Sequence, residues 1–390
     1  MLALKRGVPH NFNNVVLYKN SIGRKAKDQY PLSAYGQLQK YVLLDGQITY
    51  SALDLHSPRD PWITKGLTER SIAPLANFSN TGVYEHGSKL YTTFETKPML
   101  QIDPEQLKVD DECIFDNDWC RFASGHCQMD DLGNMWTFAN IGSTLHVMCI
   151  DKDGTAHTKH SINLGQPVYC HSFLLTDSWL IFPTFPCTID ITRLLLGRRS
   201  VVESVQFDYA NSCVQLLMIH RTSGKSVVKH LHSITSPAFH IEGDDAAIYL
   251  FATNEQFSFD DITSAAQYTS SCVRYDFAQE TFTTLPIQGD MPAYDAKSRT
   301  LAYASSSGLV FVREEHSKVV DIGCPTDEPQ LVRSDSDKLY AIQVSHPVDG
   351  GTDLHVIDAL TGVADSVYTM DHSTPQGVHG FVSYALRQKS

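Results

Sequence analysis

The histidine nearest the C-terminus, His379, lies in the stretch Pro375-Gln376-Gly377-Val378-His379-Gly380. Glycine tolerates positive φ and lets the backbone approach another group closely, so we expect this histidine at a crowded position. We group it with three distant histidines, His126, His171 and His240. Histidine side chains transfer protons and bind metals, so chemistry of either kind needs these residues together. A fold that unites them must bring distant segments to one axis and hold the last segment against the first, as radially closed β architectures do.

Composition excludes several classes of protein. The 390 residues carry a net charge of −13, and no Lys/Arg run is present, so a nucleic-acid partner is not expected. The nine cysteines are scattered without a Cys-x-x-Cys pair, which indicates a reducing compartment and no thiolate zinc site. No apolar leader opens the sequence, and no apolar run approaches about 18 residues, so we expect a cytoplasmic protein without a membrane span.

Short β-rich runs fill the chain and predict an all-β fold. They are separated by turn signals such as Asp45-Gly46, Asp153-Gly154 and Thr361-Gly362. Many short strands with little helical periodicity indicate a sandwich, a barrel or a propeller. No repeat of the WD or kelch type is present, so this pattern alone does not fix a blade number. We expect residues 1–390 to form one domain, with 1–35 as an irregular N-terminal segment.

The segment Asp190–Arg199 departs from the β pattern. It has a run of leucines, then Gly197 as a candidate helix cap and two arginines. Two interpretations stay open: a helical turn packed on the core, or an apolar lip at a substrate entrance that touches a membrane surface weakly and reversibly.

Several segments, in order, resemble the carotenoid cleavage oxygenase family, which also includes stilbene-cleaving enzymes and a retinoid isomerase branch. The similarity covers roughly residues 35–385, and the order of the motifs makes it specific. The motifs that carry it are Asn77–Val83, Phe94-Glu95-Thr96-Lys97-Pro98, Gly125-His126-Cys127, His171-Ser172-Phe173, Ala238-Phe239-His240, Glu328-Pro329-Gln330 and Val378-His379-Gly380.

The resemblance implies a seven-bladed β-propeller with one Fe(2+) on its axis and a loop or helical cap over one face. By the same resemblance, His126, His171, His240 and His379 bind the iron. Imidazole suits a divalent iron that keeps open positions for oxygen. Each ligating imidazole needs an acceptor on its other nitrogen, which fixes its tautomer and orientation.

The resemblance supplies three carboxylates for this purpose. Glu95 and Glu328 match the family motifs, and Asp290 stands where the family has a longer Glu. Their expected partners are His171, His240 and His379, with His126 unassisted. Because Asp290 is one methylene shorter, we expect either a closer strand or a bridging water.

Two further departures from the family bear on the substrate. Stilbene cleavers carry a Lys directly before the first of these glutamates, where this chain has Phe94, so phenolic stilbene cleavage is disfavoured. The third histidine is followed by Ile241-Glu242-Gly243-Asp244 instead of the usual polar-aromatic sequel.

The sequence therefore predicts a non-haem Fe(2+) dioxygenase. Its substrate would be a small, apolar, conjugated olefin of the carotenoid or apocarotenoid kind, cleaved at a C=C bond by O2 to two carbonyl products. Two alternatives remain: a propeller that serves only as a binding scaffold, and an isomerase or other olefin-cleaving activity on the same iron site.

Overall fold

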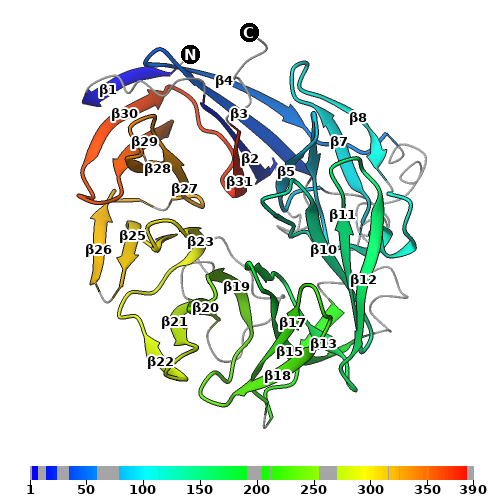
Figure 1. The fold of residues 1–390 in the computed structure, drawn as a ribbon. Helices are drawn as coiled ribbons and strands as arrows, with labels where there is room; N and C mark the ends of the chain where they lie inside the picture. The colour runs from blue at the N-terminus through cyan, green and yellow to red at the C-terminus, as the bar shows by residue number, and fades with distance from the viewer. Residues whose placement is uncertain are drawn as a thin grey trace.

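The computed structural model describes residues 2–7, 15–23, 35–58, 79–95, 97–113, 115–190, 204–210, 212–253, 270–314, 316–324, 326–348 and 350–383. These residues form seven antiparallel sheets arranged in a ring, a seven-bladed β-propeller (Figure 1). Fold class and blade number therefore agree with the resemblance. The leucines of the Asp190–Arg199 segment lie outside the described residues, so the interpretation of that segment stays a prediction.

Apart from β31, the strands of the first three blades come from the N-terminal half of the chain. Blade 1 has the strand order β31-β2-β3-β4, with β31 (Gly377–Ser383), β2 (Val15–Ile22), β3 (Gly36–Leu44) and β4 (Gln47–Asp54). Blade 2 has β5 (Val83–His86), β6 (Lys89–Thr92), β7 (Met99–Asp103) and β8 (Lys108–Cys113). The 3-10 helix η2 (Asp118–Phe122) leads to blade 3, with β9 (Gln128–Met129), β10 (Met135–Ile141), β11 (Thr144–Ile150) and β12 (Ala156–Asn163).

The other four blades follow in chain order. Blade 4 has β13 (Val168–Tyr169), β14 (Leu174–Leu175), β15 (Trp179–Ile189), β16 (Val205–Phe207), β17 (Val214–His220) and β18 (Ser226–Leu231). Blade 5 has β19 (Ala238–Gly243), β20 (Ala247–Ala252), β21 (Ser271–Asp276) and β22 (Thr281–Thr284). Blade 6 has β23 (Asp290–Asp295), β24 (Thr300–Ala304), β25 (Gly308–Arg313) and β26 (His316–Asp321). Blade 7 has β27 (Gln330–Arg333), β28 (Leu339–Ser345), β29 (Thr352–Asp358), β30 (Ala364–Met370) and, on its outer edge, β1 (Ala3–Gly7).

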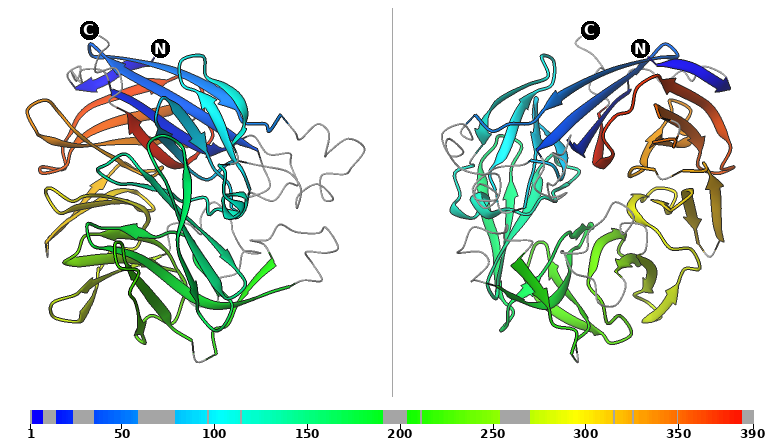
Figure 2. Two further views of the ribbon diagram at one scale, coloured as in Figure 1. Left: turned by 45° about the vertical axis from the view of Figure 1, so that its right-hand side comes forward. Right: turned by 180° about the vertical axis from the view of Figure 1, so that it is seen from behind.

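Both ends of the chain close the ring. The last strand, β31, pairs with β2 on the inner edge of blade 1, with Leu17 opposite Val382 and Asn20 opposite His379. The first strand, β1, pairs with β30 on the outer edge of blade 7, and the two lie side by side in every view (Figure 2). Closure in this way pairs sheet edges that would otherwise be open.

The prediction of an irregular segment over 1–35 is wrong, because β1 and β2 both lie within it. In β2 the polar residues Lys19, Asn20 and Ser21 are completely buried. Their side chains bond to backbone carbonyls: Asn20 donates to those of Ser79 and Gly82, each at 2.9 Å, and Ser21 to that of Gln37 at 2.8 Å. A run of buried but hydrogen-bonded polar residues has the composition of a loop, which explains the error.

The hydrophobic core of the described residues is divided into seven clusters, each between two neighbouring blades. The cluster between blades 7 and 1 includes Leu17, Tyr41, Ile342, Val356 and Tyr368. The other six clusters join the remaining neighbouring pairs in the same way. Apolar burial therefore holds the blades to one another and leaves the axis to polar side chains. No helix in the described part of the chain is long and apolar enough to span a membrane.

Leu17→Ala should lower the free energy of unfolding by about 3 kcal/mol, because it leaves a cavity in the cluster that joins blades 7 and 1. Chemical denaturation measures this change. Val348→Ala, at a side chain that is 98% exposed, is the control and should have almost no effect. Equal effects of the two changes would contradict this account of ring closure.

Candidate metal centre

The structure brings His126, His171, His240 and His379 together on the axis. One potential ligand nitrogen of each lies within 4.8 Å of the others. The Nε2 atoms of His126 and His171 are 2.9 Å apart, and the ring centroids of His240 and His379 are 5.3 Å apart. These residues come from blades 3, 4, 5 and 1, so only the closed ring assembles the cluster.

His240 on β19 meets the short carboxylate directly. Its Nδ1 lies 2.6 Å from Asp290 Oδ1, and the Ser270 hydroxyl donates to Asp290 Oδ2 at 2.9 Å. A bulge in β23 permits this contact: the register shifts between Asp290 and Pro292, and Met291 has φ +56°. Of the two alternatives left open by the missing methylene, the direct contact is the one present, without a water between the two atoms.

His379 on β31 lies 3.4 Å from Glu328, between its Nδ1 and Oε1. Glu328 Oε2 accepts from the backbone N–H of Gly380 at 2.6 Å and from Gln330 Nε2 at 2.9 Å. The crowding expected around this histidine is present, since a Cβ added at Gly377 would lie 2.5 Å from Asp327 Oδ2.

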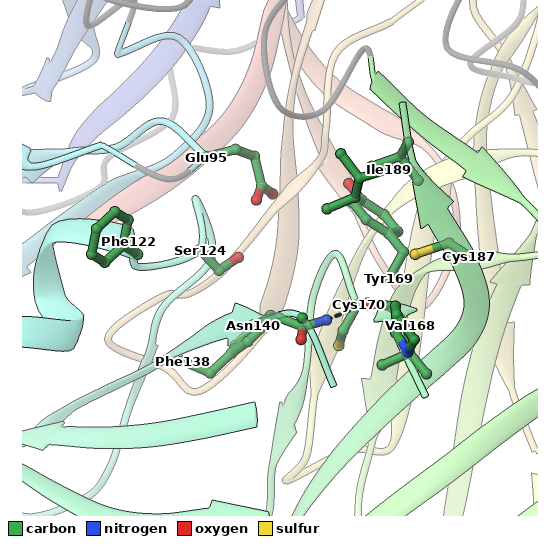
Figure 3. A pocket seen from close by; sticks show the side chains of 13 residues that line it. Glu95, Phe122, Ser124, Phe138, Asn140, Val168, Tyr169, Cys170, Cys187 and Ile189 are labelled. Atoms are coloured by element: carbon green, nitrogen blue, oxygen red, sulfur yellow. Dashed lines mark hydrogen bonds between the residues drawn. The ribbon is translucent and has the colours of Figure 1, made fainter. Parts of the chain in front are cut away.

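His171 has two oxygen neighbours at Nδ1. Glu95 Oε1 lies at 3.3 Å and the Tyr169 hydroxyl at 3.0 Å. Glu95 also faces a cavity of about 60 Å³ that is lined by Phe122, Ser124, Asn140, Tyr169 and Ile189 among others (Figure 3). Sequence reasoning missed Tyr169, although its position two residues before His171 is compatible with a shared site.

For His126, the described residues include no carboxylate at either ring nitrogen. The hydrogen bonds to Ser124 and Thr137 are made by the backbone of His126. Its N–H donates to Ser124 Oγ at 3.2 Å, and its carbonyl accepts from Thr137 Oγ1 at 3.3 Å. The three carboxylates thus lie beside His171, His240 and His379, the pairing that the resemblance implies.

The protonation of the cluster follows from burial and charge. Burial, and next the neighbouring imidazoles, lower the pKa of His126 well below its usual value, and burial lowers that of His171 against the opposing effect of Glu95. Burial also acts to lower the pKa of His240, but the charge and hydrogen bond of Asp290 outweigh it and the pKa is raised. A proton at His240 therefore competes with a metal as the pH falls.

The donor set fits a divalent transition metal. An Nδ1 that donates to a carboxylate leaves the Nε2 lone pair free to bind a metal. His240 Nε2 is buried and has no hydrogen-bond partner in the part of the chain described. Several buried imidazole nitrogens that face one another, with no proton between them, raise the free energy of the folded protein. An ion bound between these nitrogens would remove that cost.

Two charged residues near the centre were not predicted from the sequence to belong to the site. Lys19 is completely buried on β2, and its Nζ donates to the backbone carbonyl of Glu328. Burial lowers the pKa of Lys19, while Asp327 and Glu328 oppose this shift. A lysine beside Asn and Ser gave no sign of burial in the sequence.

The second is Glu242, which lines the same cavity of about 140 Å³ as His126, His240 and His379. Burial, and next the charge of Glu328, raise the pKa of Glu242 to about 8. A cation in this cavity would favour the ionised form. The sequence did show Glu242 as a departure from the family pattern after His240.

Fold and site together define a member of the carotenoid oxygenases. Residues 24–377 match the family described as "RPE65: Retinal pigment epithelial membrane protein". The chain belongs to this family. The matched region ends before His379, which is grouped with the other histidines by its position on β31.

Among characterised proteins, the chain is similar to lignostilbene-alpha,beta-dioxygenase isozyme III of Sphingomonas paucimobilis, with 29% identity over 126 residues. That match covers 30% of this chain and 26% of the relative, so it spans only about a quarter of the relative's length.

Solved structures share the fold over almost the whole chain. A cobalt-substituted Synechocystis apocarotenoid oxygenase has a TM-score of 0.78 at 18% identity, covering 97% of this chain and 95% of the other. A chimera of apocarotenoid oxygenase and RPE65 has a TM-score of 0.80 at 17% identity, covering 98% and 95%.

Asp290→Glu should lower metal occupancy by on the order of ten-fold, because the added methylene overfills a contact that is already direct. Asp290→Ala should impair it at least as strongly, since Nδ1 of His240 then loses its acceptor. Metal analysis of the purified variants measures both. Asp290→Asn keeps the size of the side chain and serves as the control; full occupancy in Asp290→Glu would show that the site has spare room.

Lys19→Met should lower the free energy of unfolding by about 3 kcal/mol, because it removes a buried cation beside Asp327 and Glu328. Thermal and chemical unfolding measure the loss. Lys40→Met is the matched control: Lys40 lies on β3 opposite Tyr18, is half-buried, and its Nζ donates to the carbonyl of Pro104 at 2.6 Å. A similar loss in both variants would mean that the burial of Lys19 has no special importance.

Proposed function

We propose that this protein is a non-haem Fe(2+) dioxygenase that cleaves a C=C bond of an apolar conjugated substrate with O2 and releases two carbonyl products. The observation that carries the proposal is the axial cluster of four histidines, of which His171 is partly exposed and the others are buried, and of which three lie beside a carboxylate. In this proposal, residues 1–390 form one propeller domain.

His126, His171, His240 and His379 would hold the iron through Nε2. Bound there, Fe(2+) would supply O2 activation next to the substrate double bond. Glu95, Asp290 and Glu328 would accept N–H bonds from three of the imidazoles and so fix their tautomer and direction. The backbone N–H of Gly380 and the amide of Gln330 hold Glu328 in turn, and the hydroxyl of Ser270 holds Asp290.

The substrate class we favour is carotenoid- or apocarotenoid-like. Phe94, directly before Glu95, is 5% exposed and offers no group that could bind a phenol oxygen. The similarity to the lignostilbene dioxygenase favours a second candidate, a stilbene, which would need contacts other than a lysine at this position.

The deciding experiment is anaerobic iron loading followed by incubation with a panel of apocarotenoids and stilbenes under ¹⁸O2. Cleavage with label in the carbonyl products supports the dioxygenase. Product without label would indicate an isomerase or other activity on the same iron. Iron far below one per chain, with no product, would indicate a binding scaffold.

Replacing any one of the four histidines by Ala should remove most of the iron and leave the fold intact, because the interblade clusters do not include these side chains. Iron analysis and circular dichroism measure the two effects. His355→Ala is the control, since His355 is equally buried but bonds to Ser345 Oγ, away from the cluster. A variant with full iron content would exclude that histidine as a ligand.

A further inference from the structure

Beyond the histidine cluster, one face of the propeller has an acidic opening. This opening, which we term the acidic funnel, is a cavity of about 600 Å³. Its ionisable lining groups are Asp130, Asp131, Asp177, Asp244, Asp245, Arg221 and Arg299. Five carboxylates against two guanidinium groups leave an excess of negative charge. Arg221 pairs with Asp130 and Arg299 with Asp244, each at 3.1 Å, while Asp131, Asp177 and Asp245 are exposed at the rim.

The acidic funnel and the histidine cavity follow each other along the same inner strands. On β9, Gln128 lines the histidine cavity and Met129 the funnel. On β19, Glu242 lines the cavity and Gly243 the funnel. Phe173, directly before β14, lines the histidine cavity, and Leu175, on β14, lines the funnel. β14 contacts both β9 and β19.

Glu242 lines the histidine cavity, and the next residue, Gly243, lines the funnel. From His240 onward the register of β19 with β20 is regular, so His240 and Glu242, two residues apart, lie on the same face of the strand. The carboxyl group of Glu242 has no hydrogen-bond partner among the described residues. At the inner end of the same cavity, His240 Nε2 is also unpartnered, and His240 is only 7% exposed.

This arrangement suits a cation that moves inward. A cleft with one sign of charge and low-dielectric walls focuses the field and raises the association rate of a counter-ion. Carboxylate oxygens bind hard divalent cations weakly enough to release them, whereas several imidazoles bind a transition metal more tightly. The order of donors from rim to centre, carboxylates and then imidazoles, therefore follows increasing affinity for ferrous iron.

The geometry points to the acidic funnel as the route by which Fe(2+) reaches the four histidines, with Glu242 as the carboxylate that receives the ion between the rim and the cluster. This inference rests on the proposed iron site, but it concerns the rate of metal uptake and not the reaction. Binding at the cluster and passage through the funnel are therefore separable by experiment.

The test uses the full-length, metal-depleted protein mixed with Co²⁺ in a stopped-flow instrument, with final occupancy measured separately at equilibrium. The combined change Asp131→Asn, Asp177→Asn and Asp245→Asn should slow uptake by about three- to ten-fold at low ionic strength and leave final occupancy unchanged. Added salt should reduce this difference, because it screens exposed charges. Glu242→Gln should also slow uptake without changing the final occupancy.

The control is Asp45→Asn, Asp153→Asn and Asp371→Asn, which changes the net charge by the same amount at exposed residues outside both cavities. It should take up Co²⁺ at the wild-type rate. If the rim variant and Glu242→Gln also load at the wild-type rate, the ion arrives elsewhere and the inference is wrong. A wild-type protein that binds no metal at equilibrium would overturn the iron site itself, a result distinct from a loss of rate alone.

Discussion

The pairing of β31 with β2 is the interaction on which the rest of the structure depends. It closes a ring whose cohesion comes from seven separate apolar clusters, each shared by two neighbouring blades. It also places His379 opposite Asn20, within reach of the other three histidines. Without that pairing, the inner edge of β2 would be open and Lys19 would lie beside water instead of the Glu328 carbonyl.

Because the apolar side chains are buried between the blades, the side chains on the axis are mainly polar. The four imidazoles and three carboxylates lie together on the axis, and their hydrogen bonds offset the cost of removing them from water. Lys19 is another buried polar residue whose interactions offset the cost of burial. It donates a hydrogen bond to the Glu328 carbonyl, and its positive charge is attracted by Asp327 and Glu328. The polar groups on the axis are thus paired with one another.

Much of the fold could be predicted from the sequence, because short alternating runs and turn residues indicate strands wherever one face is apolar. The blade number and the grouping of distant histidines came only from the resemblance, since neither is a local property. The N-terminal strands were missed for opposite reasons: β1 is exposed throughout and β2 buries polar residues, so neither shows the usual alternation. The four histidines and three carboxylates that the resemblance grouped do lie together, but their geometry could not be predicted. The Met291 bulge that brings Asp290 to His240 and the position of Glu242 depend on backbone register, which a single sequence does not reveal.

Each blade contributes one member of the axial set: His379 from blade 1, Glu95 after β6 in blade 2, and then His126, His171, His240, Asp290 and Glu328 from blades 3 to 7. A fragment of the chain that lacks a blade therefore lacks one of these seven residues, even if the fragment is stable. A second copy of another blade would not replace the missing residue. Binding of the proposed iron would consequently require every blade in its place, because a chain with one blade misplaced lacks one of the four histidines or one of the three carboxylates beside them. In a cell, the metal would thereby distinguish finished propellers from unfinished ones.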